Sequence, residues 1–534
     1  MEAKGIRKII ALAMCIILAC SITGCGRKEE ENAKKDMIKA EDDEYRTYYE
    51  IFVYSFNDSN NDGIGDLNGV TEKLDYIEDL GFNGIWLMPI MPSSSYHKYN
   101  IDDYYDIDRE YGTLDDFKRL VGECHERGIN IIIDMVFNHT SSEHQWFKEA
   151  ADYLKSLPDG EEPASDICKY VDYYNFEYGM KGVSGYSVVE GTNWYYESMF
   201  SYDMPDLNLD NAEVRKEIED ITDFWLGLGV DGFRLDAAKE YFSGNSDKNI
   251  EVLNWYSNYV KSVSDKAYVV AEVWDSFTAI SSYYKSGITS IFNYAFGNSD
   301  GQIIKAVRNA GDKKAGLKLA KNLVSSEAAY KKSNPDMIDA PFLSNHDTGR
   351  IAGFVSYDEN LVKLAGAINL FMSGNVFVYY GEELGMSGSG RDENKRAPMY
   401  WSDDENKLTT PPPNMETVEH HFGSAETQAG DEYSIYNYYR NAMILRNSIP
   451  EIARGTYSVM EGVGDGDICA VSREYNGNKI YMLFNISGED KEIVVDKASY
   501  DYSEIIGSLL VSDKKAVLKG ETVKLPAYAV VILK

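Results

Sequence analysis

The chain has 534 residues, of which 44% are hydrophobic, so it is longer than one ordinary domain and can bury a large core. Its formal net charge is −34, which argues against nucleic acid or an anionic membrane surface as a binding partner, because like charges repel. The same charge balance argues against a polyanionic substrate.

The first 25 residues are typical of a secretory signal peptide. A short basic segment precedes an apolar stretch over residues 9–22, which is brief for a membrane span. The segment ends in Ile22-Thr23-Gly24-Cys25, which is similar to a bacterial lipobox, in which the cysteine becomes the lipidated first residue. The alternative is an ordinary signal peptide with a chance cysteine. We therefore expect an extracytoplasmic lipoprotein, anchored through Cys25 at the cell surface or the periplasmic face of a membrane.

Residues 26–44 are rich in Lys and Glu and nearly free of apolar side chains, so we expect a disordered tether there. Beyond the signal segment and Cys25, only Cys124, Cys168 and Cys469 remain. They are few, odd in number and widely spaced, which predicts no disulfide framework and mostly buried thiols.

From residue 45 onward, strand-like and helix-like stretches alternate, which predicts a closed (β/α)8 TIM barrel, an α/β fold. Helical stretches include 68–80, 113–127 and, as the last barrel helix, 432–448. The strand-like runs are 49–56, 84–90, 130–137, 230–237, 267–274, 290–296, 341–346 and 376–381.

Spacing along the chain predicts the domain boundaries. Asp134 and Asp236 lie about 100 residues apart, where one barrel unit needs ~30 or more, so residues 139–203 are expected to form an inserted subdomain that walls a cleft. The barrel then comprises 45–138 and 204–450. Short alternating strands over 451–534, with an Asn476-Gly477 hairpin signal, predict a C-terminal antiparallel β-sandwich.

A loop with regularly spaced oxygen-bearing side chains follows the first predicted strand. Asp58, Asn60, Asp62 and Asp66 occupy alternate positions of the loop, with Ile64 at the one between Asp62 and Asp66, and Gly63 allows a sharp turn. This resembles the opening of a calcium-binding EF-hand loop, although Gly69 stands where the terminal Glu would be. The alternative is a loop of Asx turns that holds no ion.

Four of the predicted strands deliver a carboxylate or a histidine near their C-terminal ends, where such side chains meet on one face of a parallel barrel. Arg234 and Asp236 are two residues apart on one strand and so share a face, where Arg234 would keep Asp236 ionised. For that segment alone, a structural ion pair is an equal alternative. The four runs read D-x-V-x-N-H from Asp134, G-F-R-x-D from Gly232, E-V-W from Glu272 and N-H-D from Asn345.

In this order the four motifs resemble those of the α-amylase family of glycoside hydrolases, and the resemblance covers nearly everything after the first 45 residues. Retention at a glycosidic bond needs two carboxyl groups ~5 Å apart, which neighbouring strands four and five can supply. Asp236 is then the expected nucleophile and Glu272 the general acid, with a raised pKa in apolar and acidic surroundings. Asp347 is expected to bind substrate hydroxyls and stabilise the transition state.

The resemblance also implies substrate-binding residues. For any one histidine considered alone, a structural role is the alternative. The implied residues are His97, Tyr99, His139, Arg234, Lys239, Glu240, His346, Asp392 and Arg396.

For the loop at 58–66 the resemblance implies Ca²⁺, as in family members related to oligo-1,6-glucosidases, with Ile64 contributing its carbonyl oxygen. A second calcium near Asn138, which is common in family α-amylases, is disfavoured here, because Glu240 replaces the histidine that the family has there.

Three functions remain open. The first is hydrolysis of α-1,4-linked glucans and maltooligosaccharides by a monomeric α-amylase-type enzyme. The second is an exo-acting glucosidase or transglycosylase for short oligosaccharides, including α-1,6 linkages. The third, a catalytically inactive glucan-binding lipoprotein, is disfavoured by the intact Asp236, Glu272 and Asp347. Ala237, Met204 and His97 favour the first, because α-1,6-specific relatives carry Val and Gln in place of Ala237 and Met204.

Overall fold

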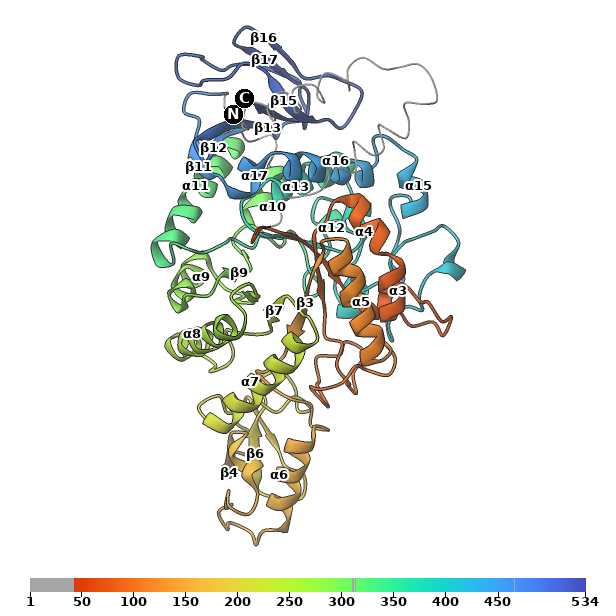
Figure 1. Cartoon of the computed structure of the whole chain (residues 1–534), viewed down its shortest axis with the longest axis vertical. Helices are drawn as coiled ribbons and strands as arrows, with labels where there is room; N and C mark the ends of the chain where they lie inside the picture. Colours follow the sequence, from red (N-terminus) through yellow and green to blue (C-terminus); the bar gives the residue numbers. More distant parts are fainter. Residues whose placement is uncertain (1–42, 310–311, 313, 465) are drawn as a thin grey trace.

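The computed structural model describes residues 43–309, 312, 314–464 and 466–534 (Figure 1). The predicted signal peptide, the proposed anchor Cys25 and nearly all of the tether lie outside the described residues. Among the residues that are described, no helix has the length and apolar character needed to cross a membrane.

A seven-stranded parallel sheet forms the centre of the molecule, in the order β10-β1-β2-β3-β7-β8-β9. Its strands read as continuous apolar runs because helices cover the outer face and side chains fill the interior. The strands are β1 (Thr47–Ile51), β2 (Gly84–Leu87), β3 (Asn130–Met135), β7 (Gly232–Leu235), β8 (Tyr268–Ala271), β9 (Ser290–Ile291) and β10 (Val376–Tyr379).

The predicted strand at 341–346 is not a regular strand, and this expectation was wrong in detail. The chain there still joins the two edges of the sheet: Asn293 N donates to Ala340 O on one side, and Phe377 N donates to Pro341 O on the other. Pro341 has no N–H to offer, which interrupts the ladder. The barrel is therefore closed by an irregular seventh segment, and the predicted TIM barrel is confirmed.

Helices surround the sheet in the expected alternation (Figure 1). The predicted helix 113–127 is α5, which begins after a capping box between Thr113 and Asp116. The predicted helix 68–80 is divided at Lys73 into two. The helices of the barrel are α3 (Leu67–Glu72), α4 (Leu74–Leu80), α5 (Leu114–Glu126), α7 (Ala212–Gly227), α8 (Ser246–Val263), α9 (Phe277–Tyr283), α10 (Gln302–Arg308), α11 (Ala315–Ser333), α12 (Ile351–Phe354), α13 (Glu359–Leu370), α14 (Asp392–Lys395), α15 (Ala425–Ala429), α16 (Ile435–Ser448) and α17 (Pro450–Arg454).

The insertion after β3 forms a small subdomain that extends away from the barrel, at the end of the molecule opposite the C-terminal sheets (Figure 1). It contains α6 (Gln145–Ser156) and an antiparallel sheet in the order β4-β6-β5. Aromatic rings join these pieces, for example Phe147 against Tyr196 at 4.7 Å. The strands are β4 (Phe176–Tyr178), β5 (Tyr186–Val188) and β6 (Trp194–Glu197).

Two antiparallel sheets, β11-β12-β13-β18-β15 and β14-β17-β16, make up the C-terminal domain. The predicted hairpin lies between β12 and β13, where Asn476 and Gly477 both have positive φ, as a type I′ turn requires. The strands are β11 (Thr456–Val459), β12 (Ile468–Tyr475), β13 (Asn478–Asn485), β14 (Lys491–Val494), β15 (Ile505–Leu509), β16 (Val517–Lys519), β17 (Thr522–Leu525) and β18 (Val530–Leu533).

The three cysteines of the described chain are free, as predicted. Cys124 and Cys469 are fully buried, and Cys168 is half-buried.

Candidate active site

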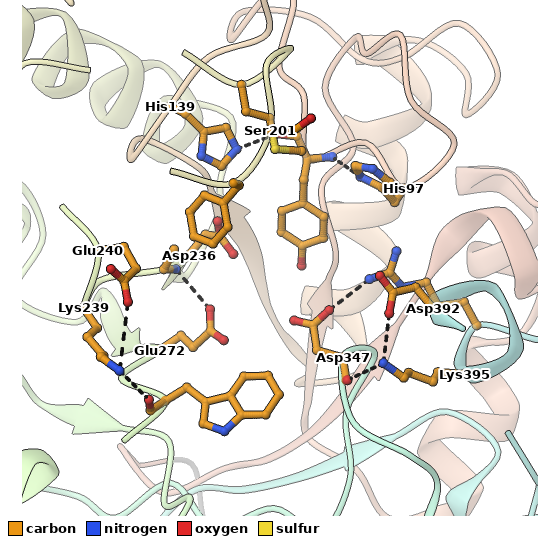
Figure 2. Close-up of a pocket in the computed structure, with 16 residues that line it drawn as sticks. His97, His139, Ser201, Asp236, Lys239, Glu240, Glu272, Asp347, Asp392 and Lys395 are labelled. Carbon is orange, nitrogen blue, oxygen red and sulfur yellow. Dashed lines mark hydrogen bonds and ion pairs between the residues drawn. The ribbon is translucent and has the colours of Figure 1, made fainter. Parts of the chain in front are cut away.

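A cavity of about 720 Å³ opens where the barrel strands end (Figure 2). It lies between the barrel and the inserted subdomain, which contributes Phe200 and Ser201. Ten of the twelve predicted catalytic and substrate-binding residues line it: His97, Tyr99, His139, Asp236, Lys239, Glu240, Glu272, Asp347, Asp392 and Arg396.

Arg234 and His346 were predicted to bind substrate, but they do not line the cavity. Both side chains are fully buried beneath it. The Arg234 guanidinium forms ion pairs with three acidic side chains, Asp134, Asp236 and Glu272, at N–O distances of 2.7–2.8 Å. Their charges hold the guanidinium in the floor of the site, directly beneath the cavity lining.

The carboxyl groups of Asp236 and Glu272 share that guanidinium. Nη1 of Arg234 donates to Asp236 Oδ1 at 2.7 Å, and Nη2 donates to Glu272 Oε2 at 2.7 Å. Their strands, β7 and β8, are adjacent and in register. The backbone N–H of Ala237 also donates to Glu272 Oε2, at 3.0 Å. One cation therefore holds two carboxyl groups side by side at the cavity wall.

Burial raises the pKa of both carboxyl groups, because the charged form loses water. Arg234 opposes that effect in both, while the charge of Asp347 adds to it. For Glu272 the charge of Asp236 raises the pKa further. The site therefore favours keeping one proton on the pair.

Asp347 faces Glu272 across the cavity (Figure 2). Arg396 Nη2 lies 2.9 Å from Asp347 Oδ1, and His346 Nε2 lies 3.1 Å from Oδ2. Burial alone would raise the pKa of Asp347, but the charges of His346 and Arg396 outweigh it and leave the pKa well below its usual range. Asp347 is therefore ionised at neutral pH.

The surroundings of His346 favour a proton on both ring nitrogens. Nδ1 lies 2.6 Å from Glu50 Oε1, and Nε2 faces the carboxylate of Asp347, so each nitrogen needs a hydrogen. Burial lowers the pKa of His346, but Asp347 and Glu50 together raise it to about 9. The hydroxyl of Tyr99 lies 2.7 Å from Nε2 and donates to Asp134.

The two histidines that line the cavity, His97 and His139, favour the neutral form at neutral pH. Burial lowers the pKa of His97 to about 4, and Arg396 adds to that effect. Burial also lowers the pKa of His139 to about 4, and its Nε2 lies 3.3 Å from the carbonyl oxygen of Tyr99. Neither ring therefore adds a positive charge to the cavity wall.

Several residues of the site had not been singled out from the sequence. Lys395 donates to the carbonyl oxygen of Asp347 at 2.7 Å and contacts Asp392 at 2.9 Å. Phe200 and Trp274 line the cavity with 50% and 45% of their surface exposed. Trp274 belongs to the E-V-W motif at the end of a predicted strand, so the sequence could have identified it as a residue of the site. No sequence pattern marks Phe200 as such a residue.

The loop at 58–66 is a series of Asx turns. The carboxylate of Asp58 accepts from the backbone N–H groups of Asn61 and Gly63, both at 2.7 Å, and Asp66 caps α3 by accepting from Gly69 N at 2.7 Å. Every candidate metal ligand in the loop is an oxygen atom, the ligand type that Ca²⁺ prefers. In the described part of the chain, no three His, Cys, Asp or Glu side chains form a metal-binding group, so an ion here would also need amide and carbonyl oxygens.

Comparisons with known proteins agree on one family. Residues 50–455 match the family described as alpha amylase, catalytic domain. Alpha-amylase 3 of Dictyoglomus thermophilum is 39% identical over 82% of this chain and 84% of its own length. The solved structure of Eubacterium rectale Amy13B is 49% identical, with a TM-score of 0.90 over 93% of this chain and 96% of that one. An alpha-amylase from H. orenii is 33% identical, with a TM-score of 0.78 over 92% of this chain and 99% of that one.

Proposed function

The chain belongs to the α-amylase family of glycoside hydrolases, and we propose that it cleaves α-1,4-glucosidic bonds in starch-like glucans and maltooligosaccharides with retention of configuration. One observation carries this proposal. Asp236 and Glu272 are bound to the same guanidinium at the wall of an open cavity, with ionised Asp347 on the opposite side. Closely spaced carboxyl groups are the arrangement that retaining glycosidases use.

In the first step the carboxylate of Asp236 attacks the anomeric carbon. The bond from that carbon to the glycosidic oxygen breaks, and Glu272 gives its proton to the departing oxygen. The products are a shortened chain with a free hydroxyl and a glycosyl ester on Asp236. In the second step Glu272 takes a proton from water, whose oxygen attacks the anomeric carbon and releases Asp236.

The remaining side chains bind the sugar and balance its charge. Asp347 is negative and stabilises the positive charge that develops on the sugar ring. Neutral His97 and His139 hydrogen-bond to hydroxyl groups, and the ring of Tyr99 provides an apolar face. Lys239 and Glu240 lie with Trp274 on the side of Glu272, where Lys239 Nζ is 3.2 Å from Trp274 O. Asp392 and Arg396 lie on the side of Asp347, which Arg396 holds in place.

The second candidate is an exo-acting glucosidase or transglycosylase. A Schizosaccharomyces pombe α-glucosidase is 28% identical over 91% of this chain, and trehalose synthases are similarly related. The product mixture decides between the two. Soluble starch converted to a ladder of maltooligosaccharides supports the amylase; release of glucose alone, or rapid cleavage of isomaltose, supports the alternative. Pullulan tests α-1,6 cleavage within a longer chain.

Two features outside the reaction belong to the same proposal. Asp58, Asn60, Asp62 and Asp66, with the carbonyl of Ile64, would hold a Ca²⁺ ion that stabilises the loop after β1 and takes no part in the chemistry. Lipid on Cys25 would anchor the enzyme to a membrane outside the cytoplasm, near polymeric substrate. We expect a monomer.

A further inference from the structure

The two oxygens of the Glu272 carboxyl group have different partners. Oε2 accepts from Nη2 of Arg234 at 2.7 Å and from the backbone N–H of Ala237 at 3.0 Å. A guanidinium and an amide N–H can only donate, so neither can share a proton carried on Oε2. When Glu272 is neutral, its proton must therefore lie on Oε1.

Oε1 has one protein partner in the described chain, the hydroxyl of Tyr294 at 3.2 Å. That hydroxyl oxygen accepts from the side-chain amide of Asn345 at 3.4 Å, which leaves the O–H to point at Oε1. The Tyr294 side chain is buried, and its ring stacks on the indole of Trp274 with centroids 5.2 Å apart and planes 12° from parallel. Tyr294 thus contacts both the acid and an aromatic wall of the cavity.

We propose that Tyr294 is a positioning residue that fixes Oε1 of Glu272 as the proton-donating oxygen and supports Trp274 in the cavity wall. The inference rests on the proposed function of Glu272. With the Tyr294 O–H occupying one lone pair of Oε1, the carboxyl proton takes the other side and faces the glycosidic oxygen. In the second step the same O–H stabilises the ionised carboxylate while Oε1 takes a proton from water.

The hydrogen bond has a predictable effect on titration. A donor to the ionised carboxylate favours the charged form and lowers the pKa. Loss of the Tyr294 hydroxyl should therefore raise the pKa of Glu272 and move the alkaline limb of the activity profile to higher pH. A residue with only a structural role would change stability without moving that limb.

The test is Tyr294→Phe, which keeps the ring and removes the hydroxyl. With maltooligosaccharide substrate we expect kcat to fall about tenfold, KM to change less than about twofold, and the alkaline limb to move up by roughly half a pH unit or more. An aryl glycoside with a good leaving group needs little proton donation, so its cleavage should fall much less.

Tyr330→Phe is the matched control. Tyr330 is also buried, and its hydroxyl donates to Asn293 Oδ1 at 3.2 Å, beside Tyr294 in the chain but away from Glu272. The control should show the wild-type pH profile at any temperature below its melting point. If Tyr294→Phe also has the wild-type kcat and pH profile, or if both variants shift alike, the inference is wrong.

Tyr294→Leu separates the ring from the hydroxyl. It should show the Tyr294→Phe pH shift and, in addition, a raised KM because Trp274 has lost its support; an unchanged KM would overturn the role for the ring. Failure of the underlying function would look different. If Glu272→Gln cleaves natural substrate normally, Glu272 is not the acid, whatever Tyr294→Phe does.

Discussion

The carboxylate of Glu50 lies 2.6 Å from Nδ1 of His346, and both side chains are fully buried. Glu50 is the next-to-last residue of the apolar strand β1, and His346 follows the irregular segment that closes the barrel. Glu50 favours the protonated form of His346, and the charge of His346 in turn lowers the pKa of Asp347, which it contacts in the cavity wall. A buried residue outside the cavity lining thus acts, through His346, on the charge of one that lines the cavity.

Glu50→Gln should make the protein less stable and change its pH dependence. His346 has a pKa of about 9 in the folded protein, above its unfolded value. Its protonation therefore stabilises the folded protein fully below about pH 6.5, and this stabilisation is lost as the pH rises through about 9. Removing one partner of a buried pair costs roughly 3–5 kcal/mol, and Gln, which still accepts a hydrogen bond, should fall at the lower end. Melting temperatures from pH 6 to 9.5 check this. If Glu50→Gln lowers the melting temperature by the same amount at every pH, His346 is not charged.

Asp236→Asn should abolish turnover, by about 10⁴-fold or more, because Asn cannot form the glycosyl ester. Stability should stay near that of the wild type. The amide oxygen can still accept from Arg234, and the neutral group avoids the burial cost that raises the pKa of Asp236. Initial rates and a thermal melt measure the two effects. Activity within tenfold of the wild type would mean that another residue is the nucleophile.

Glu272→Gln should remove the alkaline limb of the pH profile. An acid catalyst works only while protonated, so activity should decline above the pKa of Glu272, which burial raises from its ordinary value. In the variant no such proton exists, and the remaining rate should not vary over that range. A substrate with a good leaving group should restore the first step. Absence of that recovery would point to a different proton donor.

Some of the site could be predicted from sequence because it follows a local rule. Asp236, Glu272 and Asp347 each end a strand-like run, and the ends of parallel strands meet on one face of a barrel. The same rule put Arg234 beside Asp236. It could not show that three carboxylates would surround Arg234 and keep it below the cavity, because alternation along a strand says which residues share a face, not what covers them.

The rest depends on contacts that no local pattern contains. Glu50 is a single acid in an apolar strand, which signals a buried partner, but that partner is 296 positions away. Tyr294 is one of 41 tyrosines, and only the folded chain shows that its hydroxyl faces Glu272. Pro341 lies in a run whose apolar character predicts a strand, while its missing N–H makes that segment irregular.

Chelation should lower the melting temperature by several degrees, and added calcium should restore it, because an ion that binds only the folded loop stabilises the protein by mass action. Asp62→Ala should be insensitive to both treatments. Asp159→Ala is the control: Asp159 is a loop carboxylate that accepts from Tyr178 and Asn193 in the subdomain, and the variant should keep the wild-type response. An unchanged melting temperature, with no calcium found by metal analysis, would contradict the proposed site.

Ala237→Val should shift the enzyme from α-1,4 toward α-1,6 bonds. Ala237 follows the nucleophile, lines the cavity and donates its N–H to Glu272, so its side chain limits the space beside the scissile bond. Two added methyl groups narrow that space. Such changes in an apolar pocket alter discrimination by ~1–3 kcal/mol, which is roughly 10–200-fold in the ratio of kcat/KM for maltotriose and isomaltose.

The backbone adds a second effect that a control must separate. Ala237 has φ +46°, in the left-handed region, where a β-branched side chain is strained. Ala237→Val should therefore also lower the melting temperature and disturb the N–H that holds Glu272, reducing the rate on both substrates. Ala237→Gly relieves the backbone and leaves the space open, so its linkage ratio should stay on the α-1,4 side. If both variants change the ratio of kcat/KM for maltotriose and isomaltose alike, the backbone and not the pocket controls linkage choice. If the wild-type enzyme already cleaves isomaltose faster than maltotriose, the protein is an exo-acting glucosidase and not an amylase.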